Sequence, residues 1–137
     1  MEESAAMAFT CILITPEQQL LSKEIAQAIV PAHDGLMGIL TDRAPIMVRL
    51  GIGPLRIDFL DGKKNFYLVD GGLAQMKSDT LTILTPSATP ASEIDGQKAS
   101  EEYATALARK AATPREQEDR DKAIARARAK QALAGRL

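Results

Sequence analysis

GPLRIDFLDGKKNFYLV, residues 53–69, carries the pattern of a β-hairpin. Residues 55–59 (LRIDF) alternate apolar and charged side chains, which places the two kinds on opposite faces of an extended strand. Asp61 and Gly62 stand in a short polar loop typical of a hairpin, and the apolar run FYLV at 66–69 follows it. The pattern predicts two antiparallel strands joined by a short loop.

The sequence on either side of this hairpin repeats the same kind of signal. Short apolar runs are separated by turn residues at intervals of about 8–12 residues, which is typical of an all-β sandwich or barrel. We expect Asp70-Gly71-Gly72 to form a tight turn between two strands and Ser78-Asp79 to form another. The other expected strands are AFTCILIT, QLLS, EIAQAIV, GLMGIL, APIMVRL, LAQMK and TLTILT. Residues 1–87 are therefore predicted to form an antiparallel β-sandwich or barrel.

Residues 88–137 differ in character and predict a linker followed by an antiparallel two-helix hairpin. From residue 95 onward the chain has 12 alanines and one proline, a composition that favours helix. Asp95 is a suitable N-cap for the first helix. Thr113 and Glu116 have the spacing of a capping box that starts the second helix, and Gly135 is placed to end it.

The predicted hairpin offers little apolar surface for docking onto the sandwich. Large apolar side chains contribute about 1.5–3 kcal/mol each when fully buried, so those available supply on the order of 10 kcal/mol at best. Ordering ~40 residues costs about 1–2 kcal/mol per residue before helix formation offsets it. We therefore expect marginal docking that a ligand or a partner could shift. The large apolar residues are Ile94, Tyr103, Leu107, Ile124, Leu133 and Leu137.

Charge is divided unevenly along the chain. The net charge of −1 is the sum of −4 over residues 1–93 and +3 over residues 94–137, so the two parts are expected to face different neighbours. No apolar run approaches the ~20 residues that span a bilayer, and we expect no direct membrane insertion. The single cysteine excludes an internal disulfide framework and suits a reducing compartment.

The inventory of reactive side chains argues against an enzyme. His33, the only histidine, stands beside Asp34, but no nucleophile motif accompanies the pair. One histidine, Cys11 and scattered carboxylates do not make a zinc site. We expect no catalytic and no metal-binding residues. The basic second helix has no aromatic residue, so it favours an acidic protein surface over nucleic acid, and a merely solvated face stays an alternative.

The order of features resembles a known family. The chain has GILTDRAPIMVRLGIGPLRI at 38–57, VDGGLAQMKSDTLTIL at 69–84 and an Ala-rich hairpin entered through EID at 93–95. This order resembles the epsilon subunit of bacterial F-type ATP synthases, called delta in mitochondria. The resemblance implies a non-catalytic central-stalk (rotor) subunit that couples the proton-driven membrane ring to the gamma subunit and the catalytic head during ATP synthesis. It also implies a peripheral location at the cytoplasmic face of the bacterial inner membrane, as part of a complex.

The resemblance further implies two contact sites. The loop that docks onto the membrane rotor ring of c subunits corresponds to His33, Asp34, Gly35, Leu36, Met37 and Gly38. The second helix, when the hairpin extends along gamma, meets an acidic loop of the catalytic beta subunits and is expected to inhibit ATP hydrolysis. Its regulatory basic residues are Arg120, Lys122, Arg126, Arg128 and Lys130.

Some relatives bind ATP in the folded hairpin through an I-D-x-x-R-A motif. The corresponding residues here, with a further arginine, are Ile94, Asp95, Lys98, Ala99 and Arg126. Lys98 stands where the motif has arginine, and a lysine lacks the planar bidentate fork that suits phosphate. A plain helix start is the alternative for this segment, and no other cofactor is expected.

Two rival hypotheses remain beside the rotor subunit. One is a free-standing β-sandwich that binds a ligand or a protein and carries a basic helical tail. The other is nucleic-acid binding by the tail, which the net charge of −4 on residues 1–93 makes less favourable.

Overall fold

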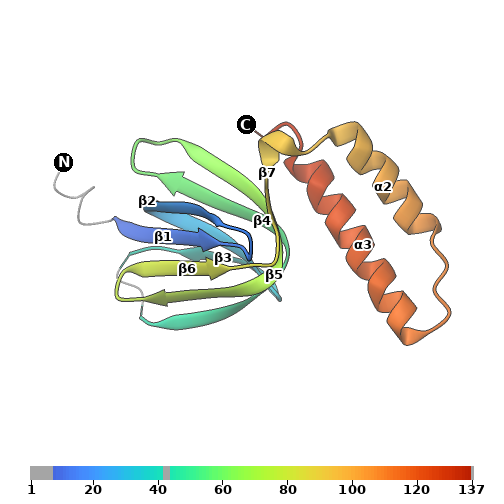
Figure 1. The fold of residues 1–137 in the computed structure, drawn as a ribbon, viewed down its shortest axis with the longest axis horizontal. Coiled ribbons are helices and arrows are strands. Elements are labelled where there is room, and N and C mark those ends of the chain that lie inside the picture. Colours follow the sequence, from blue (N-terminus) through green and yellow to red (C-terminus); the bar gives the residue numbers. More distant parts are fainter. Residues whose placement is uncertain (1–7, 42–43, 137) are drawn as a thin grey trace.

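A computed structural model describes residues 8–41 and 44–136, so residues 1–7, 42–43 and 137 of the predicted domains lie outside the described part. A β-domain is followed by two helices that lie side by side, and the second of them lies next to the β-domain (Figure 1). The strands are β1 (Phe9–Ile14), β2 (Gln19–Ala32), β3 (Gly35–Ile39), β4 (Ile46–Phe59), β5 (Lys64–Lys77), β6 (Thr80–Leu84) and β7 (Ala88–Pro90). The helices are a 3₁₀ turn η1 (Ala91–Glu93), α2 (Gly96–Ala108) and α3 (Pro114–Leu133).

The sheet closes on itself around one core. Its strand order is β1-β6-β5-β4-β2-β3, and β1 also pairs with β2, which joins the two ends of the path. All pairs are antiparallel except β1 with β6. The fully buried side chains come from both halves of this closed sheet, which confirms the predicted β-sandwich or barrel. The largest of them are Leu13, Ile25, Ile39, Leu55, Ile57, Met76, Leu81 and Ile83.

The predicted breaks inside β2 and β4 are wrong, because both strands stay hydrogen-bonded to neighbouring strands on either side of them. The runs QLLS and EIAQAIV form one strand, β2, and the runs APIMVRL and GPLRIDF form one strand, β4. Strand β4 keeps a single register against β5, from Ile46 opposite Met76 to Asp58 opposite Lys64. Pro54, which cannot donate a backbone hydrogen bond, falls where the pairing of β4 with β2 shifts.

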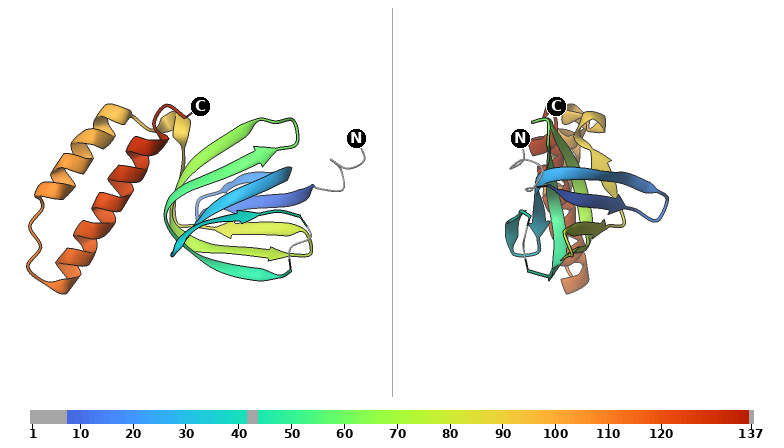
Figure 2. Two further views of the ribbon diagram at one scale, coloured as in Figure 1. Left: turned by 180° about the vertical axis from the view of Figure 1, so that it is seen from behind. Right: turned by 90° about the vertical axis from the view of Figure 1, so that its left-hand side faces the viewer.

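The predicted turn at Asp70-Gly71-Gly72 is wrong. These residues are an interior part of one strand, β5. The positive φ angles expected of its glycines are present, at 82° for Gly71 and 117° for Gly72. Opposite this segment, residues 85–87 separate β6 from β7, although both pair with β5. The strands bend here, as the long curved ribbons of β4 and β5 in Figure 2 show. We call residues 70–72 the β5 bend.

The segment expected as a linker has regular structure. Strand β7 pairs with β5, with Leu68 opposite Thr89, and η1 follows directly. The sheet therefore extends beyond residue 87. The division of the chain at residues 87 and 88 stays a prediction.

The predicted helical hairpin is confirmed, and its helices begin at the predicted caps. The Asp95 carboxylate accepts hydrogen bonds from the backbone N–H groups of Gln97 and Lys98, at 2.9 and 3.2 Å. Thr113 and Glu116 form the capping box of α3. Gly135, with φ 87°, follows the last turn. The described residues contain no helix long and apolar enough to cross a membrane.

Alanines, not large apolar side chains, form the contact between the two helices. Ala99 and Ala106 of α2 and Ala127 of α3 are buried, whereas Leu107 is 45% exposed. Small side chains let the helices approach closely, and a Cβ on Gly96 would lie 3.3 Å from that of Ala134. Helix α3 makes the hairpin's main contacts with the sandwich, on strands β4 and β5.

Candidate interaction sites on the sandwich and the hairpin

The predicted ring-docking loop is an exposed tip of the sheet. His33 and Asp34 form the turn between β2 and β3, and the His33 N–H donates to the Arg49 carbonyl at 2.9 Å. Gly35, with φ 137°, opens β3, so the rest of the predicted loop belongs to an edge strand. Leu36 is 65% exposed there. The tip can meet a partner through an exposed leucine and a short polar turn, but its role stays a prediction.

The side chains considered for metal binding lie apart in the part of the chain that the structure describes. They contain no group of three His, Cys, Asp or Glu side chains that could hold a metal ion. Cys11 lies in the core, and burial raises the pKa of its thiol to about 12. A neutral, buried thiol is a poor nucleophile and a poor metal ligand. This thiol therefore acts as a small core side chain.

The five predicted regulatory basic residues lie along α3, and each has a partner within the chain. Arg120 donates to the carbonyl oxygens of Leu107 (3.1 Å) and Arg109 (3.0 Å), and Lys122 pairs with Glu118 (3.3 Å). Arg126 pairs with Asp70 (2.6 Å), Arg128 lies over the ring of Tyr103, and Lys130 pairs with Glu102 (2.9 Å). Four of these residues contact only groups within the hairpin in these pairs, and the fifth, Arg126, joins the hairpin to the sandwich.

Two of these contacts have clear structural effects. The Arg120 guanidinium binds carbonyls at the end of α2 that have no partner within the helix, so it caps that end and ties the helices together. Lys130 and Glu102 link the two helices nearer their other end. In this conformation Arg120, Arg128 and Lys130 therefore link α3 to α2 and its C-terminal end.

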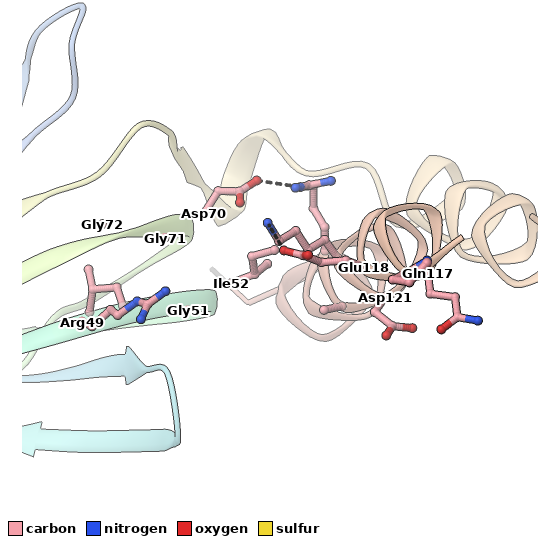
Figure 3. Close-up of a pocket in the computed structure, with 14 residues that line it drawn as sticks. Arg49, Gly51, Ile52, Asp70, Gly71, Gly72, Gln117, Glu118 and Asp121 are labelled. Atoms are coloured by element: carbon pink, nitrogen blue, oxygen red, sulfur yellow. Dashed lines mark hydrogen bonds and ion pairs between the residues drawn. The ribbon is translucent and has the colours of Figure 1, made fainter. Parts of the chain in front are cut away.

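A cleft separates the β5 bend from α3 (Figure 3). Asp70 and Gly71 line its sandwich side together with Arg49, and Glu118 and Asp121 line its helix side. The Asp70 carboxylate reaches across it to the Arg126 guanidinium, as the dashed line in Figure 3 marks. The cleft carries both signs of charge, so it has no net preference for an anion or a cation.

A small apolar cluster lies beside this ion pair. Leu133 of α3 is 2% exposed and packs with Leu68 of β5 and Ala91 of η1. Arg136 lies over the ring of Phe66, 5.6 Å from its centroid. The partly buried members are Ile52, Phe66, Ile94 and Ala129. We call this group the docking cluster; it is separate from the core of the sandwich.

The sequence contains a pattern that indicates this cluster: four consecutive apolar residues in β5, where a strand with one buried face would alternate apolar and polar residues. In the run FYLV, Tyr67 and Val69 face the core, whereas Phe66 and Leu68 point to the opposite face. A strand that is apolar on both faces has both faces covered. The outer face of this part of β5 is covered by the end of α3.

The residues of the possible ATP motif do not line one depression. Arg126 lines the cleft at the β5 bend, whereas Lys98 lines a depression between the helices with Glu101 and Glu102. Asp95 caps α2 with its carboxylate. Ala99 is fully buried, and Ile94 belongs to the docking cluster. Asp95 acts as a helix cap in this conformation, and ATP binding by residues 94–99 stays a prediction.

Known proteins resemble the chain along nearly its full length. Residues 8–91 match the family described as ATP synthase, Delta/Epsilon chain, beta-sandwich domain. The ATP synthase epsilon chain of Rhodopirellula baltica is 37% identical over 89% of this chain and 94% of its own length. That of Brucella suis is 33% identical over 66% of this chain and 67% of its own length.

Solved structures share the fold. A chain of the Euglena gracilis mitochondrial ATP synthase (OSCP/F1/c-ring) superposes with a TM-score of 0.84 at 23% identity, covering 91% of this chain and 80% of that one. A chain of the Tetrahymena thermophila mitochondrial ATP synthase (central stalk/c-ring) gives a TM-score of 0.68 at 15% identity. Together with the sequence matches over both the sandwich and the helices, these findings lead to one conclusion: the chain belongs to the delta/epsilon family of F-type ATP synthases, as an epsilon chain, a non-catalytic subunit.

Proposed function

We propose that this chain is the central-stalk subunit that connects the gamma subunit and the proton-driven ring of an F-type ATP synthase during ATP synthesis. The observation that carries the proposal is the 37% identity to an epsilon chain over 89% of the sequence, across both the sandwich and the hairpin. The solved assemblies whose chains share this fold are described as containing a c-ring and, in one case, the central stalk. A peripheral position at the cytoplasmic face of a bacterial membrane follows from this function.

The exposed tip between β2 and β3 is our candidate for the ring contact. It lies on the sandwich, carries the 65% exposed Leu36, and is held by the hydrogen bond from His33 to Arg49. A rigid tip with an exposed apolar side chain can dock onto polar loops of a partner with little loss of conformational freedom. Asp34 is acidic on one side of Gly35, but Leu36 on the other side is not, so we expect shape and apolar contact to contribute more to docking than charge.

The hairpin is our candidate for a brake on ATP hydrolysis. In the folded form its five basic residues bind groups of the same chain, as described above. Release of α3 from the sandwich frees the Arg126 guanidinium, and separation of the two helices frees Arg120, Arg128 and Lys130. These charges then suit an acidic loop of the catalytic beta subunits. No ATP is required for this mechanism.

Co-purification with the gamma subunit tests the proposal. The full chain is compared with a truncated chain that ends at Glu93 and so keeps the sandwich with β7 and η1. We expect both to bind gamma, because the sandwich supplies the contact. Failure of both to bind would remove the rotor proposal and favour a free-standing binding module.

Two further measurements separate the ring contact from the brake. Leu36→Glu is expected to weaken binding of the gamma complex to the isolated c-ring, whereas Leu60→Glu, at a leucine 47% exposed in the β4–β5 loop, leaves it unchanged. ATP hydrolysis by the assembled head is expected to rise when the truncated chain replaces the full chain. Equal hydrolysis with both chains would show that the hairpin is not a brake.

A further inference from the structure

The hairpin is held to the sandwich by two contacts of different kind. Among the ion pairs between described residues, Asp70–Arg126 is the pair that joins the two parts. The docking cluster around Leu133 supplies the apolar contact, and it is separate from the sandwich core. Because the contact is small and detached from the core, the hairpin can leave the sandwich without opening either part.

The two contacts lie on one stripe of α3. Arg126, Ala129 and Leu133 are spaced by three and four residues, so they share the helix face toward the sandwich. Arg126 stands about 10 Å along the axis from Leu133, which is two helical turns. The stripe therefore holds the helix at two points, and neither point alone fixes its direction against the sheet.

The sandwich side of the ion pair is rigid. Asp70 begins the β5 bend, and its backbone N–H donates to the Ser87 carbonyl at 3.2 Å. Asp70 lies opposite Ile52 and Gly72 lies opposite Leu50, so pairing with β4 holds the chain on both sides of Gly71. The Asp70 carboxylate is thus presented on a fixed corner of the sheet, whereas Arg126 reaches it with a long side chain from the movable helix.

We propose that Asp70 and Arg126 form the salt-sensitive half of a two-part latch, and that Leu133 in the docking cluster forms the salt-insensitive half. The Asp70 and Arg126 side chains are 30% and 37% exposed, so ions and competing carboxylates reach the pair. An acidic partner surface opens the latch by offering Arg126 a carboxylate in place of Asp70. The regulatory meaning of the latch rests on the proposed function, but the latch itself is a property of the isolated chain.

Charge screening distinguishes the two halves. A partly exposed pair weakens as ionic strength rises, because the Debye length falls from about 10 Å at 0.1 M to about 3 Å at 1 M salt. The apolar contact of Leu133 has no such dependence. Removing the ion pair should raise the ratio of released to docked hairpin about two- to five-fold at low salt, the range typical of exposed pairs.

The experiment measures docking in the isolated full-length chain. Spin labels on Lys63→Cys and Lys110→Cys, both exposed and remote from the latch, report the distance between the sandwich and the tip of the hairpin. The buried thiol of Cys11 does not compete for the label. The chain carrying these two labels is compared with versions that add Asp70→Asn or Arg126→Gln, at 0.05 M and 1 M sodium chloride.

A matched control and a rescue make the result specific. Glu118→Gln removes one negative charge from the same cleft without touching the cross-domain pair, since Glu118 pairs with Lys122. Asp70→Lys combined with Arg126→Glu restores the pair with its charges exchanged. We expect release with either single latch variant, loss of the salt response in both, no change with Glu118→Gln, and recovery in the exchanged pair.

The latch is overturned by equal docking in the parent and in Asp70→Asn, or by a salt response that persists in that variant. Leu133→Ala is the comparison for the other half, and we expect it to release the hairpin at both salt concentrations, because the apolar contact does not depend on ionic strength. None of these outcomes involves gamma or the ring, so failure of the latch leaves the rotor proposal intact. Conversely, failure to bind gamma leaves the latch measurement unaffected.

Discussion

At the scale of single residues, the glycines of the β5 bend make both the corner of the sheet and the position of Asp70. Gly72 combines a φ of 117° with the close approach of the Leu84 carbonyl oxygen to the place where a Cβ would stand. Either feature disfavours a side chain, and together they exclude one without movement of β6. The bend, and with it the carboxylate that meets Arg126, depends on this residue.

Gly72→Ala is expected to destabilise the sandwich by about 4 kcal/mol or more, because the new methyl group collides with backbone rather than with a flexible side chain. Gly62→Ala is the matched control, since Gly62 has a φ of 89° but no atom within 4 Å of its Cβ position. The control should lose only about 1–2 kcal/mol from left-handed backbone strain. Urea unfolding followed by circular dichroism measures both, and equal losses would contradict the collision.

The positive φ angles at residues 71 and 72 were predictable from the sequence, but the position of these glycines inside a strand was not. Glycine at positive φ serves turns and strand bends alike, and nothing local distinguishes them. The distinction came from the partner strands, because the register of β4 continues unbroken past the bend. For the same reason the sequence divides APIMVRL from GPLRIDF at residues 51 and 52, although β4 runs through both positions.

At the scale of elements, the hairpin is defined by its caps and by small side chains. The Thr113 hydroxyl accepts from the Glu116 N–H at 3.1 Å, and the Glu116 carboxylate accepts from the Thr113 N–H at 3.0 Å. These bonds were predictable because capping is a local property of a few adjacent residues. The buried face was not predictable in the same way, since the large side chain of Leu107 is exposed while Ala99 and Ala106 of the same helix are buried.

Thr113→Ala is expected to destabilise α3 by about 1 kcal/mol, the usual cost of losing an N-cap side chain.

Hydrogen bonds from the backbone of Thr113, its side chain and the backbone of Ala112 hold the pKa of Glu116 below its ordinary value. A lowered folded-state pKa means stability that is present above the unfolded-state value and lost as pH falls through the folded-state value. Nuclear magnetic resonance titration of the Glu116 carboxyl should show this lowered pKa.

Two comparisons bear on this prediction. Glu116→Gln keeps a side-chain oxygen that can accept the cap bonds and should remove this part of the acid sensitivity of the hairpin. Ser100→Ala, which removes a hydroxyl bonded to the Gly96 carbonyl within α2, is the control and should leave the Glu116 pKa unchanged. A Glu116 pKa at or above its ordinary value would contradict the capping geometry.

At the scale of the whole molecule, the chain has two apolar clusters of very different size. The core of the closed sheet contains the side chains from β1 to β6, and the docking cluster holds Leu133 against Leu68 and Ala91. The small size of the docking cluster was predictable from the scarcity of large apolar residues after residue 93. The location of the contact was not predictable, because it depends on which face of β5 the hairpin reaches.

The sandwich is expected to fold without the hairpin. A chain that ends at Glu93 should unfold cooperatively, with a midpoint temperature within about 5 °C of the full chain, because the core of the closed sheet is complete. Residues 94–137 alone should show little helix, since short helices without tertiary contacts are marginal. Differential scanning calorimetry and circular dichroism measure the two fragments, and a sandwich that fails to unfold cooperatively would contradict the separation.

The pairing of β1 with β6 sets an order of events during synthesis. The sheet cannot close until residue 84, the last of β6, has left the ribosome, and every strand of the sandwich precedes Ala91. At about 5–20 residues per second, residues 96–133, which form α2 and α3, follow over several seconds. In that interval the sandwich is finished while Phe66 and Leu68 have no helix over them. A nascent partner that reached this face first would meet a bare surface, and the hairpin would then have to compete for it.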